Sequence, residues 1–358
     1  MIFKAPPISA ALAERLGELD EMRRALGREV SQPVPWMGAL RRTVRASSIK
    51  GSTSIEGFSV DPEDAIALVS GEEPADDVDE NRMAVSSYAR AMDHVGIMAQ
   101  DPSFSWEERV ILDLHFDACY FQRDKSPGQW RGGPIAVTEG DGTLAYRAPD
   151  ADRVPALMAE VVRWLREDGE DQNVVVQAAM AHLHVVSVHP FRDGNGRVSR
   201  IVQSLVLARE GLISPEFSSI EEYLGRNTSA YYAALKQAQG GTYLPDRDTS
   251  GWVAFCVEAH LAQARQRLEQ IKAAATRWGQ LESLVAERGW PERLVIALEQ
   301  SLTGGTGRGT YGKEAEVSRA TASADFRRLM DAGLVDQRGR GKNTSYRASE
   351  ELRSIASA

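Results

Sequence analysis

One stretch, from His189 to Arg200, brings together side chains that could carry out phosphate chemistry. It reads His-Pro-Phe-Arg-Asp-Gly-Asn-Gly-Arg-Val-Ser-Arg. An imidazole can accept a proton, a carboxylate can bind Mg²⁺, and arginines pair with phosphate oxygens in a bidentate geometry. Nowhere else in the sequence do a base, a carboxylate, a glycine-rich turn and two arginines come so close together. These residue types therefore predict a cradle for nucleotide phosphates, with a metal and a base.

The glycines of this stretch could supply a phosphate-binding backbone. Residues 194–196, Gly-Asn-Gly, can adopt angles that most residues avoid, and we expect a turn that opens a helix near Arg197. Successive N–H groups in such a turn bind anions, and the helix N-terminus adds partial positive charge. His189 precedes Pro190, which favours an extended conformation at the end of the preceding helix. For Gly-Asn-Gly taken alone, an ordinary turn between helices stays open.

Two apolar segments must position this stretch. Residues 174–186 upstream are almost continuously apolar. Downstream, apolar residues recur at the spacing of one buried helix face. The pattern predicts two core helices joined by the loop. The downstream apolar residues are Val198, Ile201, Val202, Leu205 and Val206.

The whole stretch resembles the Fic domain signature, His-x-Phe-x-Asp/Glu-Gly-Asn-Gly-Arg-x-x-Arg, at every fixed position. The resemblance implies an all-α Fic fold with a β-hairpin flap, and transfer of AMP from ATP to a hydroxyl of a target protein. It makes His189 the catalytic base, Asp193 the ligand of a Mg²⁺ cofactor, and ATP the co-substrate. Phe191 would anchor the loop in the core, and Arg200 would lie nearest the γ-phosphate. The residues implied in nucleotide binding are Phe191, Arg192, Asp193, Gly194, Asn195, Gly196, Arg197 and Arg200.

A second stretch, residues 52–57, reads Ser-Thr-Ser-Ile-Glu-Gly. Locally, Thr53 and Glu56 could form a capping box at a helix start, with Gly57 as a stop or turn. The stretch also resembles the inhibitory pattern Ser/Thr-x-x-x-Glu-Gly/Asn that many Fic proteins carry. That resemblance implies an inhibitory helix at about residues 47–58 that uses Ser52, Glu56 and Gly57.

By the same resemblance, Glu56 would pair with Arg200. A carboxylate in that position removes a ligand from the γ-phosphate, so that bound ATP presents its α-phosphate out of line. Loss of the attack geometry can cost orders of magnitude in rate.

One clear hairpin signal occurs in the first two thirds of the chain. Residues 135–137 read as a strand, residues 139–142 (Glu-Gly-Asp-Gly) as a turn, and residues 144–146 as the returning strand. The hairpin could be a surface element with no role in the function. The Fic resemblance implies instead a flap that pairs its edge with an extended segment of the protein substrate. The residues implied in this docking are Pro134, Ile135, Ala136 and Val137.

Residues 223–235 place two tyrosines on a predicted helix. Such pairs usually pack in a core. The stretch also resembles the Fic segment that closes the nucleotide pocket, which implies that Asn227 and one of Tyr231 or Tyr232 contact the nucleoside. His115 lies on a largely apolar predicted helix, and we expect it in the core or supporting the site rather than as a ligand.

The last 70 or so residues have a different character. Helices are predicted at 294–302, 313–317 and 321–332, followed by strands at 333–335 and 345–347 around a basic tip. This order resembles a winged helix-turn-helix, a small α+β domain in which a helix enters the DNA major groove and the wing touches phosphates. A protein-docking or dimer-contact role stays open, because residues 285–358 hold 12 Lys and Arg against 10 Asp and Glu.

The 358 residues exceed one typical domain, and 42% hydrophobic with 26% charged residues is ordinary for a soluble globular protein. We predict an N-terminal helical region at 1–105, a catalytic domain at 106–275 and a winged helix at 285–358. The first 284 residues carry a net charge of −11, so the bulk of the chain does not have the charge of a nucleic-acid binder.

The sequence also bears on location. It shows no secretory signal core and no apolar run long enough to span a bilayer, which predicts a cytoplasmic protein without membrane contact. Cys119 and Cys256 are expected to be buried thiols, with a structural disulfide as the open alternative.

The resemblance and these observations predict a protein adenylyltransferase that modifies a target protein and itself on Ser, Thr or Tyr, inhibited by Glu56 at Arg200. Two alternatives stay open. One is removal of AMP, or transfer of another phosphate-linked group, at the same site. The other is a DNA-binding regulator with secondary catalysis. A homodimer that controls access to Glu56 also stays open.

Overall fold

The structure is a computed structural model that describes residues 1–71, 79–138, 140–167, 172–339 and 344–356. Contacts within the chain divide it into two compact units. The predicted domain boundaries, 1–105, 106–275 and 285–358, are a different division and stay a prediction. The first unit comprises residues 1–28, 48–59 and 79–265, and the second comprises residues 29–47, 60–78 and 266–358.

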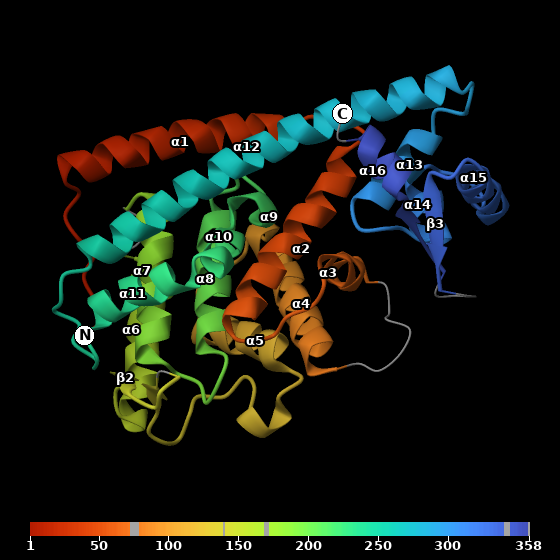
Figure 1. Ribbon diagram of the computed structural model, residues 1–358. Coiled ribbons are helices and arrows are strands. Elements are labelled where there is room, and N and C mark those ends of the chain that lie inside the picture. Colours follow the sequence, from red (N-terminus) through yellow and green to blue (C-terminus); the bar gives the residue numbers. More distant parts are fainter. Residues whose placement is uncertain (72–78, 139, 168–171, 340–343, 357–358) are drawn as a thin grey trace. The chain divides into compact units, whose positions relative to one another are not determined.

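The first unit is mostly helical and is built around α8 (Asn195–Arg209). Helix α8 packs against α4 (Glu80–Gln100), α5 (Glu108–Cys119) and α7 (Val174–Val188), as Figure 1 shows. Nearly every residue of α7 and α8 is buried, which confirms the predicted pair of core helices. Because α8 also buries arginines and other polar residues, these side chains need partners inside the protein.

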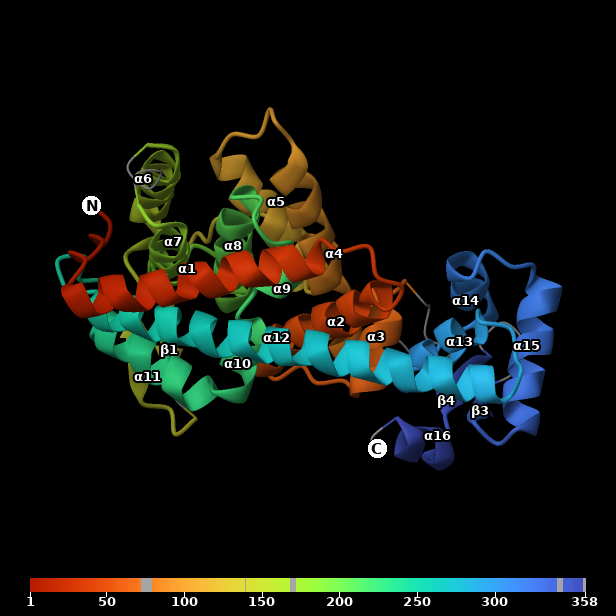
Figure 2. The ribbon, with the colours of Figure 1, turned by 90° about the horizontal axis from the view of Figure 1, so that it is seen from above.

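Further helices cover this core. Helix α1 lies along the first part of α12 (Figure 2), where Arg15 and Arg265 pair with Glu258 and Glu18. The additional elements of the first unit are α1 (Ala10–Val30), the end of α2 (Met37–Ile55), η1 (Arg123–Lys125), η2 (Ala151–Arg153), α6 (Val154–Arg166), α9 (Pro215–Ser218), α10 (Glu221–Arg226), α11 (Thr228–Gln239) and the first part of α12 (Ser250–Glu287).

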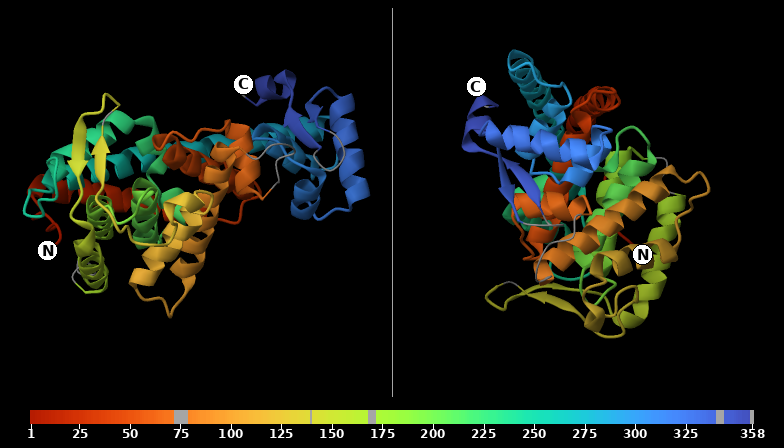
Figure 3. Two further views of the ribbon diagram at one scale, coloured as in Figure 1. Left: turned by 90° about the horizontal axis from the view of Figure 1, so that it is seen from below. Right: turned by 90° about the vertical axis from the view of Figure 1, so that its right-hand side faces the viewer.

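The predicted hairpin is present in the first unit (Figure 3). Strand β1 (Ala136–Thr138) pairs antiparallel with β2 (Leu144–Arg147), and the register shifts between Val137 and Thr138. The other edge of β2 is occupied, because the Arg147 N–H donates to Gly241 at 2.9 Å. Within the described residues no strand pairs with the other edge of β1, whose side chains are exposed. Pro134 and Ile135 precede the strand, and residue 139 of the predicted turn lies outside the described residues.

The second unit contains helices followed by a hairpin, in the order that the sequence predicts. Helix α16 was not predicted. Arg340 and Lys342, at the predicted basic tip, lie outside the described residues. The elements are the first part of α2, α3 (Pro62–Val69), the second part of α12, α13 (Leu294–Leu302), α14 (Arg308–Glu314), α15 (Arg319–Asp331), β3 (Val335–Arg338), β4 (Ser345–Ala348) and α16 (Glu350–Ile355).

Polar and aromatic contacts fix the second unit. The ring of Phe326 on α15 stacks on Tyr346 of β4 at 3.8 Å. Two early segments of the chain are anchored in the same unit. Arg42 on α2 pairs with Glu314 on α14 at 3.0 Å. Glu63 on α3 pairs with Arg347 of β4. The chain on both sides of residues 48–59 therefore belongs to the second unit.

Two features of the fold relate to sequence expectations. Cys119 and Cys256 are both buried and free, so they form no disulfide. In the part of the chain that the structure describes, no helix has both the length and the apolarity that a membrane crossing needs.

Candidate active site

His189 lies at the C-terminal end of α7 in a left-handed conformation, with φ 51° and ψ 56°. The predicted extended conformation before Pro190 is therefore wrong. The His189 N–H donates to Val185 at 3.0 Å, and this helix-ending bond outweighs the preference that the following proline imposes. Arg131 holds the turn from outside, since its Nε donates to the His189 carbonyl at 2.8 Å.

The His189 imidazole is arranged to accept a proton. Its Nδ1 lies 3.1 Å from the carbonyl of Val186, and because a carbonyl only accepts, Nδ1 carries the hydrogen in the neutral ring. Nε2 is then the basic nitrogen, and the side chain lines a cavity. Burial lowers the pKa of His189 below its usual value, with the charge of Arg131 acting in the same direction. The ring is therefore neutral at pH 7, as the sequence predicts.

The loop is fastened from inside by Asn195 and Phe191. The Phe191 N–H donates to Asn195 Oδ1, and Asn195 Nδ2 donates back to the Phe191 carbonyl, both at 2.9 Å. Phe191 is fully buried, and its ring stacks on His115 at 3.6 Å. The anchoring position predicted for Phe191 is thus observed, and the amide of Asn195 is used to close the loop.

His115 supports the loop as the sequence analysis expected. Its Nδ1 accepts from the Gly128 N–H at 2.8 Å, so its Nε2 carries the hydrogen and donates to the Asp193 carbonyl at 2.9 Å. Burial lowers the pKa of His115 to about 4, so the ring stays neutral.

Two glycines are required for different reasons. Gly194 has φ +76°, and a Cβ there would lie 2.3 Å from the sulfur of Cys119. Gly196 is helical, because α8 already begins at Asn195 rather than near Arg197. A Cβ on Gly196 would lie 2.3 Å from Glu56 Oε1. The predicted Gly-Asn-Gly turn is therefore only partly correct: Gly194 turns, and Gly196 leaves room for an anion at the start of α8.

Asp193 offers a carboxylate at the cavity. Its Oδ1 accepts from the Gly194 N–H at 2.6 Å, and its Oδ2 accepts from Gln122 Nε2 at 2.9 Å. No group of three or more His, Cys, Asp or Glu able to hold a metal occurs among the residues that the structure describes. A single carboxylate suits Mg²⁺, which proteins commonly hold by one or two carboxylates together with substrate phosphates.

Arg197 and Arg200 are each about 1% exposed and keep donors without partners among the described residues. Arg197 Nη2 donates to Gln122 at 2.8 Å, while its Nε and Nη1 are unpaired. Arg200 Nη1 is likewise unpaired. Buried donors without acceptors are costly, so the two guanidinium groups form a site that favours an anion. Arg200 lines the cavity, whereas Arg197 lies behind the loop against Phe58 and Phe121.

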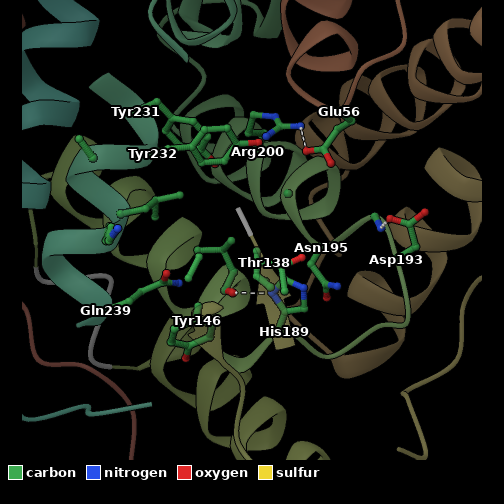
Figure 4. A pocket seen from close by; sticks show the side chains of 18 of the residues that line it. Glu56, Thr138, Tyr146, His189, Asp193, Asn195, Arg200, Tyr231, Tyr232 and Gln239 are labelled. Carbon is green, nitrogen blue, oxygen red and sulfur yellow. Dashed lines mark hydrogen bonds and ion pairs between the residues drawn. The ribbon is translucent and has the colours of Figure 1, made fainter. Parts of the chain in front are cut away.

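Residues 52–57 meet Arg200 directly. Arg200 Nε donates to Ser52 Oγ at 2.6 Å, and its Nη2 donates to Glu56 Oε1 at 2.8 Å. Figure 4 shows Glu56 and Arg200 pointing toward one another beside the cavity. These residues end helix α2 rather than start a helix, so the capping-box alternative is wrong. Gly57, with φ +87°, is the stop.

The cavity has a volume of about 660 Å³. Tyr231 is buried and Tyr232 half exposed, and both line it, as do Val137 and Thr138 of the hairpin. Asn227 is not a lining residue. It caps α10, and its Nδ2 donates to the Tyr223 carbonyl at 2.9 Å. The lining residues are Glu56, Val137, Thr138, Gly140, Ala145, Tyr146, Val186, His189, Arg192, Asp193, Gly194, Asn195, Gly196, Arg200, Tyr231, Tyr232, Ala233, Leu235, Lys236 and Gln239.

Several residues that support the site were not predicted from the sequence. Gln122 bridges Asp193 and Arg197, Arg131 holds the carbonyl of His189, and Lys236 and Gln239 line the cavity. The available signal was Arg131 itself, a charged residue between Trp130 and Gly132 just before the predicted hairpin.

Comparisons with known proteins relate part of the chain to one family. Residues 105–207 match the Fic/DOC family. A probable protein adenylyltransferase of Aquifex aeolicus is 36% identical over 96 residues, which cover 27% of this chain and 27% of that protein. Protein adenylyltransferase Fic of Drosophila melanogaster is 36% identical over 159 residues, which cover 42% of this chain and 28% of that protein. The matches thus span little more than a quarter of these relatives' length.

Solved structures show the same fold. A Fic family protein from Desulfovibrio desulfuricans has a TM-score of 0.60 at 20% identity, covering 97% of this chain and 98% of that one. Fic-1 of Caenorhabditis elegans has a TM-score of 0.58 at 20% identity, covering 73% of each chain.

Proposed function

The chain belongs to the Fic/DOC family, and from this premise we propose that it is a protein adenylyltransferase inhibited by its own Glu56. It would transfer AMP from ATP to a Ser, Thr or Tyr hydroxyl of a target protein and of itself. The observation that carries the proposal is the pairing, at one cavity, of a neutral imidazole with a buried arginine that keeps an unpaired donor.

Arg200 and the start of α8 would receive the outer phosphates. The unpaired Nη1 of Arg200 and the partial positive charge of the α8 N-terminus favour an anion there. Tyr231 and Tyr232 line the same cavity and would contact the nucleoside. Asp193 would hold Mg²⁺, which when bound offsets the negative charge of the phosphate oxygens. Asn227 keeps its proposed nucleoside contact only if its side chain leaves the Tyr223 carbonyl.

His189 would act as the general base. The substrate hydroxyl loses its proton to His189 Nε2 while its oxygen forms a bond to the α-phosphorus. The bond between that phosphorus and the bridging oxygen to the β-phosphate breaks, and pyrophosphate leaves with the electron pair. A positioned base of this kind contributes about 10²–10⁴ in rate.

The exposed edge of β1 would hold the target segment. Val137 and Thr138 line the cavity, so a peptide that adds to this edge passes close to His189. Main-chain hydrogen bonds would set the register of the peptide with little demand on its sequence.

Glu56 would hold the enzyme off. Its Oε1 lies 2.8 Å from Arg200 Nη2 and also lies against Gly196, at the first turn of α8. The carboxylate therefore occupies the place that an outer phosphate needs. ATP bound beside it would present its α-phosphate out of line, and misalignment of this kind can cost on the order of a hundredfold in rate.

The test uses ATP labelled on the α-phosphate, with the full chain as enzyme and as acceptor in a cell extract. We expect Glu56→Gly to raise labelling of the protein and of target bands by about 10- to 100-fold. Glu56→Gln, which keeps the shape without the charge, should fall between. Adding His189→Ala to Glu56→Gly should abolish labelling, and with the purified chain alone ATP labelled on the γ-phosphate should label nothing.

Equal labelling by the wild type and Glu56→Gly would refute the inhibitory role. Undiminished transfer by the double variant would refute the role of His189. The mass of the adduct decides between AMP and another phosphate-linked group. DNA binding by the C-terminal unit stays a prediction, since Arg340 and Lys342 lie outside the described residues.

A further inference from the structure

A second acidic side chain, Glu221, interacts with Arg200 and is not among the residues that line the cavity. Glu221 is the first residue of α10 and is 2% exposed. Its Oε1 accepts from the Tyr88 hydroxyl at 2.6 Å and from the Ser204 hydroxyl at 3.3 Å, and its Oε2 accepts from Ser219 at 2.9 Å. Burial raises the pKa of Glu221, and the hydrogen bonds from Tyr88 and Ser219 and the charge of Arg200 act against that rise.

Tyr88 and Ser52 connect this carboxylate to Arg200. The Nε–H of Arg200 can only donate, so Ser52 Oγ accepts it at 2.6 Å. Burial raises the pKa of Tyr88, and the Ser52 hydroxyl acts against that rise, as a hydrogen-bond donor to the Tyr88 oxygen does. Because the Tyr88 hydroxyl donates to Glu221, the Ser52 hydroxyl must be the donor to Tyr88. Every bond in the row then points the same way, from the guanidinium of Arg200 to the carboxylate of Glu221.

All members of this row are buried. Tyr88 and Ser52 are 0% exposed, and Arg200 is 1% exposed. Hydrogen bonds in such surroundings are stronger than in water and polarise one another along a chain. A buried guanidinium also needs a counter-charge, because an uncompensated charge in the interior is strongly destabilising. Glu56 is the visible counter-charge, but it is the one that an outer phosphate of ATP would replace.

We propose that Glu221 is a positioning residue that acts through Tyr88 and Ser52 to hold Nε of Arg200. The Ser52 carbonyl also accepts from Nη2 at 3.1 Å, which leaves Nη1 and the Nη2 hydrogen now paired with Glu56 to receive phosphate. Glu221 is then the fixed acceptor behind Arg200, and Glu56 the exchangeable one. The inference rests on the proposed function, in which Arg200 lies nearest the γ-phosphate. Ser52 then has a second role: although it belongs to the proposed inhibitory segment, it also supports the productive position of Arg200.

The test compares ATP with ADP, because ADP lacks the phosphate that Arg200 would contact. Binding of each nucleotide is measured by calorimetry on the full chain carrying Glu56→Gly. Tyr88→Phe removes one hydroxyl and breaks the row, and Glu221→Gln removes the charge at its end. Each should weaken ATP binding roughly tenfold and leave ADP binding unchanged, since a hydrogen bond to a charged group accounts for about one factor of ten.

Three further variants calibrate the result. Arg200→Ala sets the largest ATP-specific loss. Tyr311→Phe is the matched control, because Tyr311 also donates a buried hydroxyl to a carboxylate, that of Asp325, at 2.8 Å in the second unit. Ser204→Ala removes a hydroxyl from Glu221 outside the row to Arg200. Neither control should change the ratio of ATP to ADP affinity.

The outcomes are distinct. If Arg200→Ala weakens ATP alone but Tyr88→Phe and Glu221→Gln weaken ATP and ADP equally, or neither, Glu221 merely fastens α10 and the inference is wrong. If Arg200→Ala itself does not discriminate between the nucleotides, the γ-phosphate role in the proposed function fails, and the inference fails with it. A selective loss of ATP binding in all three, with both controls unchanged, supports it.

Discussion

At the scale of single residues, the protonation state of His189 would set the pH range of the proposed AMP transfer. Burial lowers the pKa of His189, so the neutral form persists below the usual value of about 6.5. We therefore expect the transfer rate of the Glu56→Gly protein to be constant from pH 8 to about pH 6.5 and to fall only at lower pH. The initial rate of labelling at saturating ATP measures this profile.

Nucleotide binding over the same pH range is the control, because it separates titration of the base from loss of ATP. A rate that already halves near pH 7 or above would show that the catalytic base is not a histidine with a lowered pKa.

Residues of the loop could be predicted because their spacing in the sequence is local. His189, Asp193 and Arg200 all fall within one stretch. Their supports come from far away in the chain and follow no periodic pattern. The tertiary packing around α5, the hairpin and α10 is what brings Gln122, Arg131 and Glu221 to their contacts. The side chains that would react could therefore be predicted from the sequence, whereas the side chains that hold them in place could not.

At the scale of elements, α2 and α10 approach each other backbone to backbone beside the site. A Cβ on Gly51 would lie 2.5 Å from the Glu221 carbonyl oxygen, and one on Gly225 would lie 2.6 Å from the Gly51 carbonyl oxygen. These distances are too short for any side chain, so the two backbones touch. This contact places Ser52 and Glu56 against Arg200.

Gly51→Ala should therefore push the end of α2 away from α10. Alanine favours helices over glycine by about 1 kcal/mol, but the clash opposes that gain, and overpacking typically costs about 1–3 kcal/mol. We expect labelling to rise severalfold over the wild type while staying below that of Glu56→Gly, because Ser52 moves away from Arg200 as well.

The α-labelled ATP assay measures the rise in labelling. The thermal unfolding midpoint measures the effect of the clash on stability. Ser54→Ala is the control, since Ser54 is exposed on the same turn of α2. A Gly51→Ala protein with unchanged labelling and unchanged midpoint would show that the contact does not place the inhibitory residues.

Helix boundaries were predictable where apolar periodicity was strong, as in α13, whose predicted and observed bounds agree. The boundaries of helix α2 were not predictable, because residues 37–55 contain many small and polar residues and two glycines. The pattern at 52–57 therefore suggested a helix start, although the helix ends there. Only the packing against α10 shows why glycine occupies position 51.

At the scale of the whole molecule, buried histidines couple stability to pH. Burial lowers the pKa of His115 to about 4 and those of His182, His184 and His260 to about 3. Their unfolded value is about 6.5, so below that pH the unfolded chain binds protons that the folded chain does not. Each histidine therefore lowers the free energy of unfolding as pH falls, by about 2 kcal/mol at pH 5.

His184 isolates one such contribution, because neither of its ring nitrogens has a partner among the described residues and its ring packs edge-on against Trp164. His184→Leu should reduce the slope of the unfolding free energy with pH near pH 5 by about 1.4 kcal/mol per pH unit. In thermal unfolding from pH 7 to pH 5, the stability of the variant relative to the wild type should increase as the pH falls. Parallel curves would contradict the assignment.

The way the chain passes between the two units has a consequence for how such a protein can change by recombination. Residues 48–59 lie in one unit, while the segments on both sides of them are anchored in the other through Arg42–Glu314 and Glu63–Arg347. An exchange of the C-terminal third for an unrelated module would remove Glu314 and Arg347 and leave both anchors without partners. We therefore expect the segment that carries Glu56 and the C-terminal residues that anchor its flanks to be inherited together.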